Sequence, residues 1–314
     1  MQVTAVGRSA GRTAIGAAAY RAGERLRDER SGTLYNYADR QDVLHSEIVL
    51  PSRFTGSQAD WARDRATLWN TAEHAEIRRD ARVAREYMLA LPHELSAAQR
   101  VALTRTLSKE LADRYGVAID AALHAPRAHG DPRNYHVHLL ATTREVTATG
   151  LGAKTGLDLN ETRRYELGLG RSSEEFLALR ERSATLINDA LQAADLVARV
   201  DHRSLAAQGI DREPRARLPW GAYLAEKRGL HSAIAERVRE KYRARLESRA
   251  QRLARAPALA PAPVAAAGPK ESSLGDIRRS ARESWLRLRA SPVRGVEQGK
   301  EQGKEQGSER DFAL

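Results

Sequence analysis

The stretch LHAPRAHGDPRNYHVHLLATT, residues 123–143, decides the prediction of the fold. Its first residues end the extended run GVAIDAALHA, its middle is a loop rich in Pro, Gly and Asp, and its end is the apolar run YHVHLLATT. A turn-rich loop between two extended runs is consistent with a β-hairpin. The same stretch holds four of the nine histidines of the chain, which are His124, His129, His136 and His138.

Three of these histidines are expected on one face of such a hairpin. Residues two apart in a strand point to the same side, so His136 and His138 project together while Val137 points into the core. If the hairpin closes around residues 126–134, His124 lies almost opposite His136, at the spacing of about 5 Å between cross-strand neighbours. The imidazoles would then converge on one point, as a divalent cation requires.

The spacing alone leaves a simpler interpretation open, in which His124 is a lone, partly buried histidine and the other two face water. His129 lies in the loop and is the reserve candidate for a ligand. If a metal is bound, neutral imidazoles without a thiolate leave open coordination positions, which is the arrangement of a catalytic site. Imidazole suits Zn, Mn, Co and Ni better than Mg or Ca, and a cation held this way can act as a Lewis acid on a phosphate.

The charge of the chain favours a polyanionic partner. Lys and Arg outnumber Asp and Glu by 52 to 41, which gives a formal net charge of +11 and a pI near 10.2. This sign favours nucleic acid first and an acidic membrane surface second. The chain has no cysteine, which excludes a disulfide framework and a Cys-based zinc finger. We see neither a secretory signal nor an apolar run of about 18 residues, so we expect a cytoplasmic protein without membrane insertion.

Strands and helices are expected to alternate along the first part of the chain. Extended runs are predicted at residues 2–6, 43–51, 84–92, 116–125 and 135–146, and helices at 13–26, 57–79, 96–115 and 172–194. Ser96 with Gln99, and Ser172 with Glu175, have the spacing of a capping box at the start of a helix. Several connections are short, which favours antiparallel neighbours and therefore an α+β fold, an antiparallel sheet flanked by helices.

Three parts are predicted along the chain: a compact first domain at residues 1–215, a basic helical extension at 216–255, and a tail at 256–314. In the extension, apolar residues recur every four residues from Leu230 to Leu246, and the opposite side of this helix is very basic. That basic face is either merely solvated or follows the phosphates of duplex DNA. The tail contains a Pro/Ala linker, a short helix and the repeat EQGKEQGKEQG, which has almost nothing to bury and is expected to be disordered.

A metal site that cuts a phosphodiester needs a nucleophile, which is either water or a side chain. Tyr20 is a candidate because it ends an Ala-rich helical stretch and is followed by Arg21. A free tyrosine has a pKa of about 10, so only about a thousandth is phenolate at neutral pH and the residue must be activated. Composition does not select Tyr20 over the other candidates, which are Tyr35, Tyr37, Tyr87, Tyr115 and Tyr135.

Several separated segments resemble one known family. The segments GRTAIGAAAYRAGERL, VLHSEIVLP, LALPHEL, NYHVHLL and DHRSLAAQGIDREP occur in this order and spacing in MobA/MobL-type plasmid relaxases, which belong to the HUH (His-hydrophobic-His) endonuclease superfamily. The resemblance covers about Met1 to Pro214. It implies the relaxase fold, a five-stranded antiparallel sheet flanked by helices, with the first strand at the centre of the sheet.

The resemblance also implies the roles of individual residues. Tyr20 matches the nucleophilic tyrosine of the family, His136 and His138 match the His-hydrophobic-His pair, and His124 matches the third metal ligand. Glu86 is expected to be the acidic group near the tyrosine and to accept its proton. The cofactor is expected to be a divalent metal, Mn²⁺ or Mg²⁺. Four cations are hypothetical phosphate contacts, each of which could equally be a solvated surface residue: Arg8, Arg12, Arg21 and Lys154.

The implied activity is the nicking and rejoining of one DNA strand at the transfer origin of a mobilisable plasmid. The substrate is single-stranded or melted origin DNA, and the products are a 5′-phosphotyrosine and a free 3′-hydroxyl. Accessory mobilisation proteins and a coupling protein are the expected protein partners. Two alternatives stay open, a rolling-circle replication-type HUH nuclease and a catalytically decayed protein that only binds single-stranded DNA. The segment DHRSLAAQGI argues against the first, and the survival of the tyrosine and the histidines argues against the second.

This sequence departs from the pattern of the family at three points. Its first strand is expected to be shorter than in relatives, because few residues precede VGRSAGR. Relatives often carry Glu where Met88 stands, whereas Glu86 lies two residues earlier on the same face of the strand. We also expect no helicase or primase region after the predicted relaxase domain.

Overall fold

The computed structural model describes residues 1–127 and 131–255. These residues fall into two compact units, which meet between Arg212 and Glu213 in the chain. The linker, the short helix and the EQGK repeat predicted for residues 256–314 lie outside the described residues, and so does His129. No helix in the described part of the chain is long and apolar enough to cross a membrane.

An antiparallel sheet forms the centre of the first unit. Its strands are β1 (Gln2–Gly7), β4 (Val43–Val49), β5 (Arg82–Ala90), β6 (Ile119–His124) and β7 (His136–Thr142), and their order across the sheet is β1-β5-β7-β6-β4. All four pairings are antiparallel, which confirms the predicted fold class. The expectation that the first strand lies at the centre of the sheet was wrong, because β1 pairs with β5 at one edge and β7 is central.

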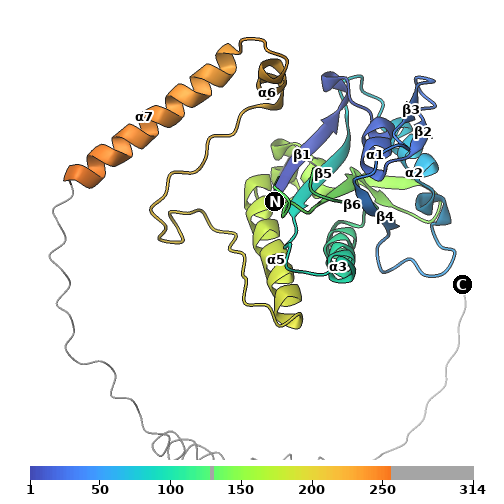
Figure 1. Cartoon of the computed structure of the whole chain (residues 1–314). Helices are drawn as coiled ribbons and strands as arrows, with labels where there is room; N and C mark the ends of the chain where they lie inside the picture. The colour runs from blue at the N-terminus through green and yellow to red at the C-terminus, as the bar shows by residue number, and fades with distance from the viewer. Residues whose placement is uncertain (128–130, 256–314) are drawn as a thin grey trace, which may run out of the picture. The chain divides into compact units, whose positions relative to one another are not determined.

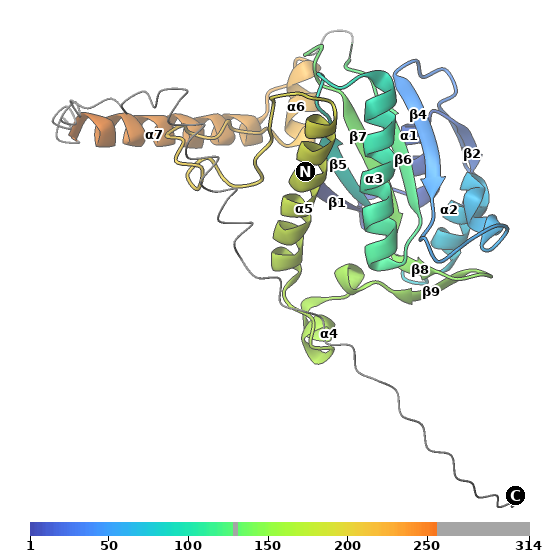
Figure 2. The same ribbon diagram turned by 90° about the horizontal axis from the view of Figure 1, so that it is seen from below.

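Helices cover both faces of this sheet (Figure 2). On one face, α3 (Ala97–Tyr115) and α5 (Ser172–Ala193) pack on strand residues that include Leu123, Val137 and Leu139. On the other face, α1 (Ala14–Ala22) and α2 (Arg65–His74) pack on a second core that includes Leu140. Because side chains alternate along a strand, the histidines next to Val137 and Leu139 point to the α1 face.

Local signals explain where the main helices begin. The capping box predicted for α3 is present: Oγ of Ser96 accepts from the Gln99 amide, and the Gln99 side chain accepts from the Ser96 amide at 2.8 Å. The second predicted box was wrong, because α5 begins after Arg171 without a side-chain cap, and the Ser172 hydroxyl bonds Glu161 instead. In α1, Oγ1 of Thr13 caps the first turn at 2.9 Å from the Gly16 amide.

Smaller elements surround the sheet. One hairpin is formed by β2 (Arg25–Arg27) and β3 (Leu34–Asn36), and a second by β8 (Arg144–Val146) and β9 (Leu151–Lys154). The helix predicted for residues 57–79 is shorter, because the chain first makes the 3-10 turn η2 (Asp60–Arg63) and α2 ends at His74. The remaining short elements are η1 (Arg8–Ala10), η3 (Gly156–Asp158) and α4 (Glu161–Glu166).

The described residues of the second unit, 213–255, contain two helices, α6 (Trp220–Lys227) and α7 (Ala233–Arg255), which are labelled in Figure 1. The sequence predicted one helix from about Leu230, but α7 begins three residues later. Gly229 separates the two helices with a φ of 74°, a left-handed conformation that glycine adopts without strain.

Candidate metal centre

The hairpin register places the three histidines together. His124 at the end of β6 pairs with His136 at the start of β7, and His138 lies two residues further along β7. The ring centroids are 5.4 Å apart for His124 and His136, 4.7 Å for His124 and His138, and 5.2 Å for His136 and His138. One nitrogen from each ring lies within 4.8 Å of the others, so a single cation fits the donor geometry.

Each imidazole is held by a hydrogen bond to an oxygen. Nε2 of His124 lies 2.7 Å from the Arg21 carbonyl, Nδ1 of His136 lies 3.0 Å from the Asn134 carbonyl, and Nδ1 of His138 lies 2.6 Å from Oε1 of Glu86. Because carbonyls and carboxylates only accept, each ring donates from that nitrogen, and in a neutral ring the other nitrogen has a lone pair for a metal. Such a bond on the outer nitrogen orients a histidine that ligates a metal.

The centre favours neutral imidazoles. Burial lowers the pKa of His124 to about 4, and the neighbouring His138 and His136 act in the same direction. Burial also lowers the pKa of His136. Both rings are therefore neutral at neutral pH, which is the state that binds a metal.

Glu86 lies on β5, the strand that pairs with the one carrying His136 and His138. Three side chains donate hydrogen bonds to its carboxylate. Its carboxylate accepts from Nδ1 of His138 at 2.6 Å, from Nε of Arg21 at 2.8 Å and from Oγ1 of Thr4 at 3.1 Å. Burial by itself favours the neutral acid, but the hydrogen bonds from His138 and Arg21 and the charge of Arg21 outweigh it and lower the pKa of Glu86. A carboxylate with a lowered pKa is a weak base. The contacts therefore do not support the prediction that Glu86 accepts the proton of Tyr20, and they fit a residue that orients His138.

Tyr20 stands in the last turn of α1, directly before the residue whose carbonyl contacts His124. Its side chain is 41% exposed, so a substrate can reach the phenol. The Tyr37 ring packs against it edge-on with a centroid distance of 5.2 Å, and the guanidinium of Arg40 lies 4.1 Å from its ring centroid.

Two other tyrosines are poorly placed for the same role. Tyr87 is buried in the core under α3 and α5, on the face away from the histidines, and burial raises its pKa. Burial and the nearby Glu175 carboxylate raise the pKa of Tyr115, which packs against the same core. Neither has the access that a nucleophile needs.

The structure gives inward contacts to two of the predicted phosphate-binding cations. Arg8 donates to the buried Glu73 carboxylate at 3.0 and 2.7 Å and to the carbonyls of Glu76 and Arg78 at 2.7 and 2.9 Å. Lys154 lies on β9, in the hairpin that follows β7 in the chain, and forms an ion pair of 2.9 Å with Glu76. Both cations form ion pairs that stabilise the fold, so we do not propose either as a phosphate contact.

Of the other two predicted cations, Arg21 lies beside the metal centre and Arg12 is exposed to solvent. Arg21 forms an ion pair of 2.7 Å with Glu86 and thereby supports the metal centre. Arg12 is exposed and keeps its guanidinium accessible.

Sequence reasoning missed Arg40 and Asp42, which join Tyr20 to the histidine strands, because no local pattern marks the connection from β3 to β4.

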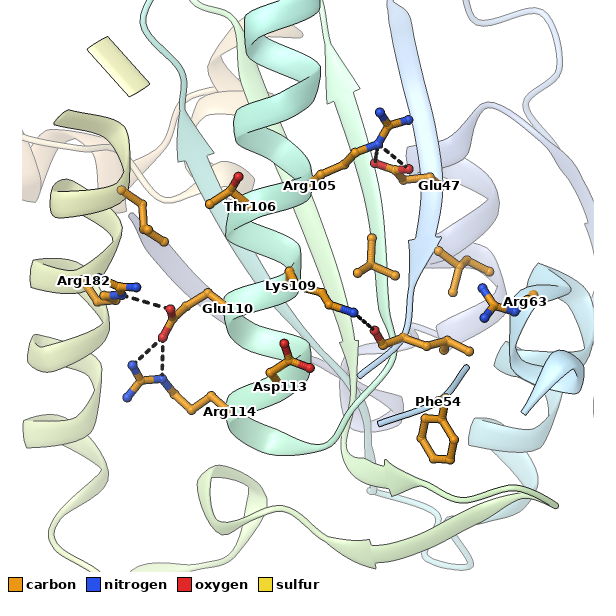
Figure 3. Close-up of a pocket in the computed structure, with 14 residues that line it drawn as sticks. Glu47, Phe54, Arg63, Arg105, Thr106, Lys109, Glu110, Asp113, Arg114 and Arg182 are labelled. Atoms are coloured by element: carbon orange, nitrogen blue, oxygen red, sulfur yellow. Dashed lines mark hydrogen bonds and ion pairs between the residues drawn. The ribbon is translucent and has the colours of Figure 1, made fainter. Parts of the chain in front are cut away.

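A large groove lies elsewhere, between α3 and the edge strand β4, and measures about 980 Å³ (Figure 3). Five of its charged side chains pair with one another: Glu47 with Arg105 at 2.9 Å, and Glu110 with Arg114 at 2.5 Å and with Arg182 at 2.9 Å. Since α3 covers the face opposite to the histidines, this groove is separate from the candidate metal centre.

Comparison with known proteins points to one family. The family model described as MobA/MobL family matches residues 12–228. The mobilization protein MobL of Acidithiobacillus ferridurans is 39% identical over 246 residues, which cover 71% of this chain and 62% of that protein. A probable mobilization protein MobA of Bifidobacterium longum is 31% identical over 260 residues, covering 73% of this chain and 44% of that protein. The chain thus spans less than two thirds of the length of these relatives.

A solved structure shares the fold. It is described as the molecular basis of vancomycin resistance transfer in Staphylococcus aureus, and it superposes with a TM-score of 0.53 at 25% identity. The match covers 65% of this chain and 97% of that one, which is consistent with a fold that lies within the first unit.

Proposed function

The chain belongs to the MobA/MobL family, and on that premise we propose that it is a conjugative relaxase that nicks and rejoins one strand of plasmid DNA. The observation that carries the proposal is the convergence of His124, His136 and His138 within 4.8 Å, beside the end of the helix that presents Tyr20. A metal-binding cluster and an accessible phenol are the two parts that phosphodiester cleavage by a side chain requires.

The donor set fits a divalent metal. His124, His136 and His138 would hold it through the ring nitrogens that keep a lone pair, and no thiolate restricts the site to a structural role. When bound, such a cation polarises a phosphate and neutralises the charge that builds on its oxygens. Mn²⁺ or Mg²⁺ is the expected ion, and three imidazoles favour Mn²⁺ of the two.

Tyr20 supplies the nucleophile in this proposal. Its phenolic oxygen forms a bond to the scissile phosphorus while the bond from phosphorus to the 3′ oxygen breaks. The phenol loses its proton and the departing 3′ oxygen gains one, so the products are a 5′-phosphotyrosine and a free 3′-hydroxyl. One phosphate ester replaces another, so the reaction needs no external energy source and can run backwards to rejoin the strand.

The residues around the cluster act as supports. Glu86 fixes the ring of His138, Arg21 holds the Glu86 carboxylate, and the Arg21 carbonyl fixes His124. This single connected set ties the helix of Tyr20 to strands β5, β6 and β7. A displacement of about 1 Å between reacting groups can cost about 100-fold in rate, so such support matters for the chemistry.

The substrate in this proposal is single-stranded or melted DNA at a transfer origin. Accessory mobilisation proteins and a coupling protein stay predictions. The decisive experiment incubates the full chain with a labelled origin oligonucleotide and Mn²⁺, and then separates the products by denaturing gel electrophoresis. A covalent protein–DNA band that needs both the metal and the origin sequence supports the proposal. Cleavage without a covalent band, or no cleavage, contradicts it.

A further inference from the structure

Arg40 contacts both the backbone and the ring of Tyr20. It lies in the connection between β3 and β4, outside the segments that form the histidine cluster. One terminal nitrogen donates to the Tyr20 carbonyl at 2.5 Å, and the centre of its guanidinium lies 4.1 Å from the centroid of the Tyr20 ring. A guanidinium over an aromatic face is attracted by the electron density of that face. One side chain therefore restrains Tyr20 at two points.

The ring of Tyr20 is also restrained on a second side. The ring of Tyr37 meets it at an interplanar angle of 90° with a centroid distance of 5.2 Å, an edge-to-face contact. A tyrosine that is 41% exposed would otherwise sample several rotamers in solvent. Arg40 and Tyr37 together limit the directions that the phenol can take.

Asp42 anchors Arg40 to the strands that carry the histidines. The Asp42 carboxylate accepts two hydrogen bonds from Arg40, at 2.8 and 2.5 Å. The backbone carbonyl of Asp42 accepts from the Ala125 amide at 2.8 Å, and the next residue, Val43, pairs with His124. Tyr20 is thus connected through Arg40 and Asp42 to the end of β6, where the histidine cluster begins.

We propose that Arg40 is a positioning residue for Tyr20: it holds the phenol in one orientation beside the histidine cluster, ready for the attack. The inference rests on the proposed function, because it assigns Arg40 to the reaction in which the phenol attacks a phosphorus. In that step the Tyr20 proton leaves, the new oxygen–phosphorus bond forms, and the 3′ oxygen departs and takes up a proton. The guanidinium keeps its own proton throughout.

An arginine suits this position better than a lysine. A planar guanidinium can stack on a ring while its edge makes paired bonds to a carboxylate, whereas an ammonium is a point charge that cannot do both. Arg40→Lys therefore keeps the charge and loses the geometry. Arg40→Ala loses both.

The test measures two quantities for each variant. The single-turnover rate of covalent adduct formation on an origin oligonucleotide with Mn²⁺ reports the chemistry, and fluorescence anisotropy with the same oligonucleotide reports the Kd. Arg40→Ala should lower the adduct rate by about 100-fold, the loss expected for a misplaced reacting group, while the Kd changes by less than about threefold. Arg40→Lys should lie between Arg40→Ala and the natural chain. Guanidinium ion added to Arg40→Ala should restore part of the rate.

Matched variants separate the possible explanations. Arg105→Ala removes another carboxylate-paired arginine on the opposite face and should leave the rate unchanged. Asp42→Asn keeps Arg40 but weakens its anchor, and should lower the rate even if Arg40→Ala does not fold.

An unchanged rate in Arg40→Ala, or a Kd that weakens as much as the rate falls, would overturn the positioning role. The second result would make Arg40 a DNA contact. If Tyr20→Phe still forms the adduct, the proposed nucleophile is wrong, which is a failure of the proposed function and not of the Arg40 contacts.

Discussion

His138 and Glu86 lie on neighbouring strands, and Nδ1 of His138 donates to Oε1 of Glu86 at 2.6 Å. The pair has the arrangement of a carboxylate that orients a metal-binding imidazole, and loss of such a partner costs about 10- to 100-fold in metal affinity. Glu86→Gln should therefore weaken Mn²⁺ binding by this factor in calorimetric titration and lower nicking with it. If Mn²⁺ binding stays normal while the adduct rate falls, Glu86 acts on Tyr20 and the original prediction of a proton acceptor returns.

Removing any one of the three histidines should have a larger effect than removing Glu86. His124→Ala, His136→Ala and His138→Ala should each reduce Mn²⁺ affinity and adduct formation together. A double variant should lose little more than a single one, because ligands of one cation act as a unit and their effects are not additive. Undiminished Mn²⁺ binding in His124→Ala would remove that residue from the site and leave His129 as the next candidate.

Glu110 provides a prediction about stability that does not involve the metal centre. It pairs with Arg114 one turn further along α3 and with Arg182 on α5, so the second pair joins the two helices (Figure 3). Burial opposes ionisation, but the hydrogen bonds and charges of the two arginines outweigh it and lower the pKa of Glu110. The folded state therefore binds a proton less readily than the unfolded state, so the bridge stabilises the protein above the ordinary glutamate pKa. This stabilisation is lost as the pH falls through the lowered value.

Glu110→Gln should accordingly lower the free energy of unfolding at pH 7 by about 0.5–1 kcal/mol, the range of a partly exposed ion pair. The difference from the natural chain should disappear at acidic pH, where Glu110 is protonated. Urea unfolding at both pH values measures it. If the free energy of unfolding differs between Glu110→Gln and the natural chain by the same amount at both pH values, the arginines do not stabilise the carboxylate.

The second unit provides a prediction about salt. Arg237, Lys241 and Arg245 are spaced four residues apart on α7, and Lys241 and Arg245 line a groove of about 520 Å³ with the segment 214–217. If this surface follows duplex phosphates, each lost contact should reduce the slope of log affinity against log salt by about one unit. Arg237→Ala with Lys241→Ala should show this on duplex-flanked origin DNA, while nicking of a short single strand stays unchanged. Identical salt slopes would mean that the basic face is only solvated.

Short-range patterns predicted much of the architecture and the histidine geometry. The register of β6 and β7 follows from one loop and from strand alternation, so the pairing of His124 with His136 could be derived before the fold was known. The cap at Ser96 is equally local.

Long-range contacts account for what the sequence did not predict. Arg8 is neutralised by Glu73, which is 65 residues away in the chain, and nothing near Arg8 indicates this partner. The edge position of β1 depends on its pairing with β5, and Arg40 contacts Tyr20, which lies 20 residues away in the chain. Residues whose partners come from distant segments were therefore misjudged or missed.

The account depends most directly on Tyr20 as the covalent nucleophile. The measurement is mass spectrometry of the protein–DNA adduct after protease and nuclease digestion, with Tyr20→Phe as the matched variant. The account predicts a nucleotide attached to the peptide that contains Tyr20, and no adduct in Tyr20→Phe despite nearly unchanged DNA binding. A nucleotide on Tyr35, Tyr37 or another residue, or an adduct that persists in Tyr20→Phe, would contradict it.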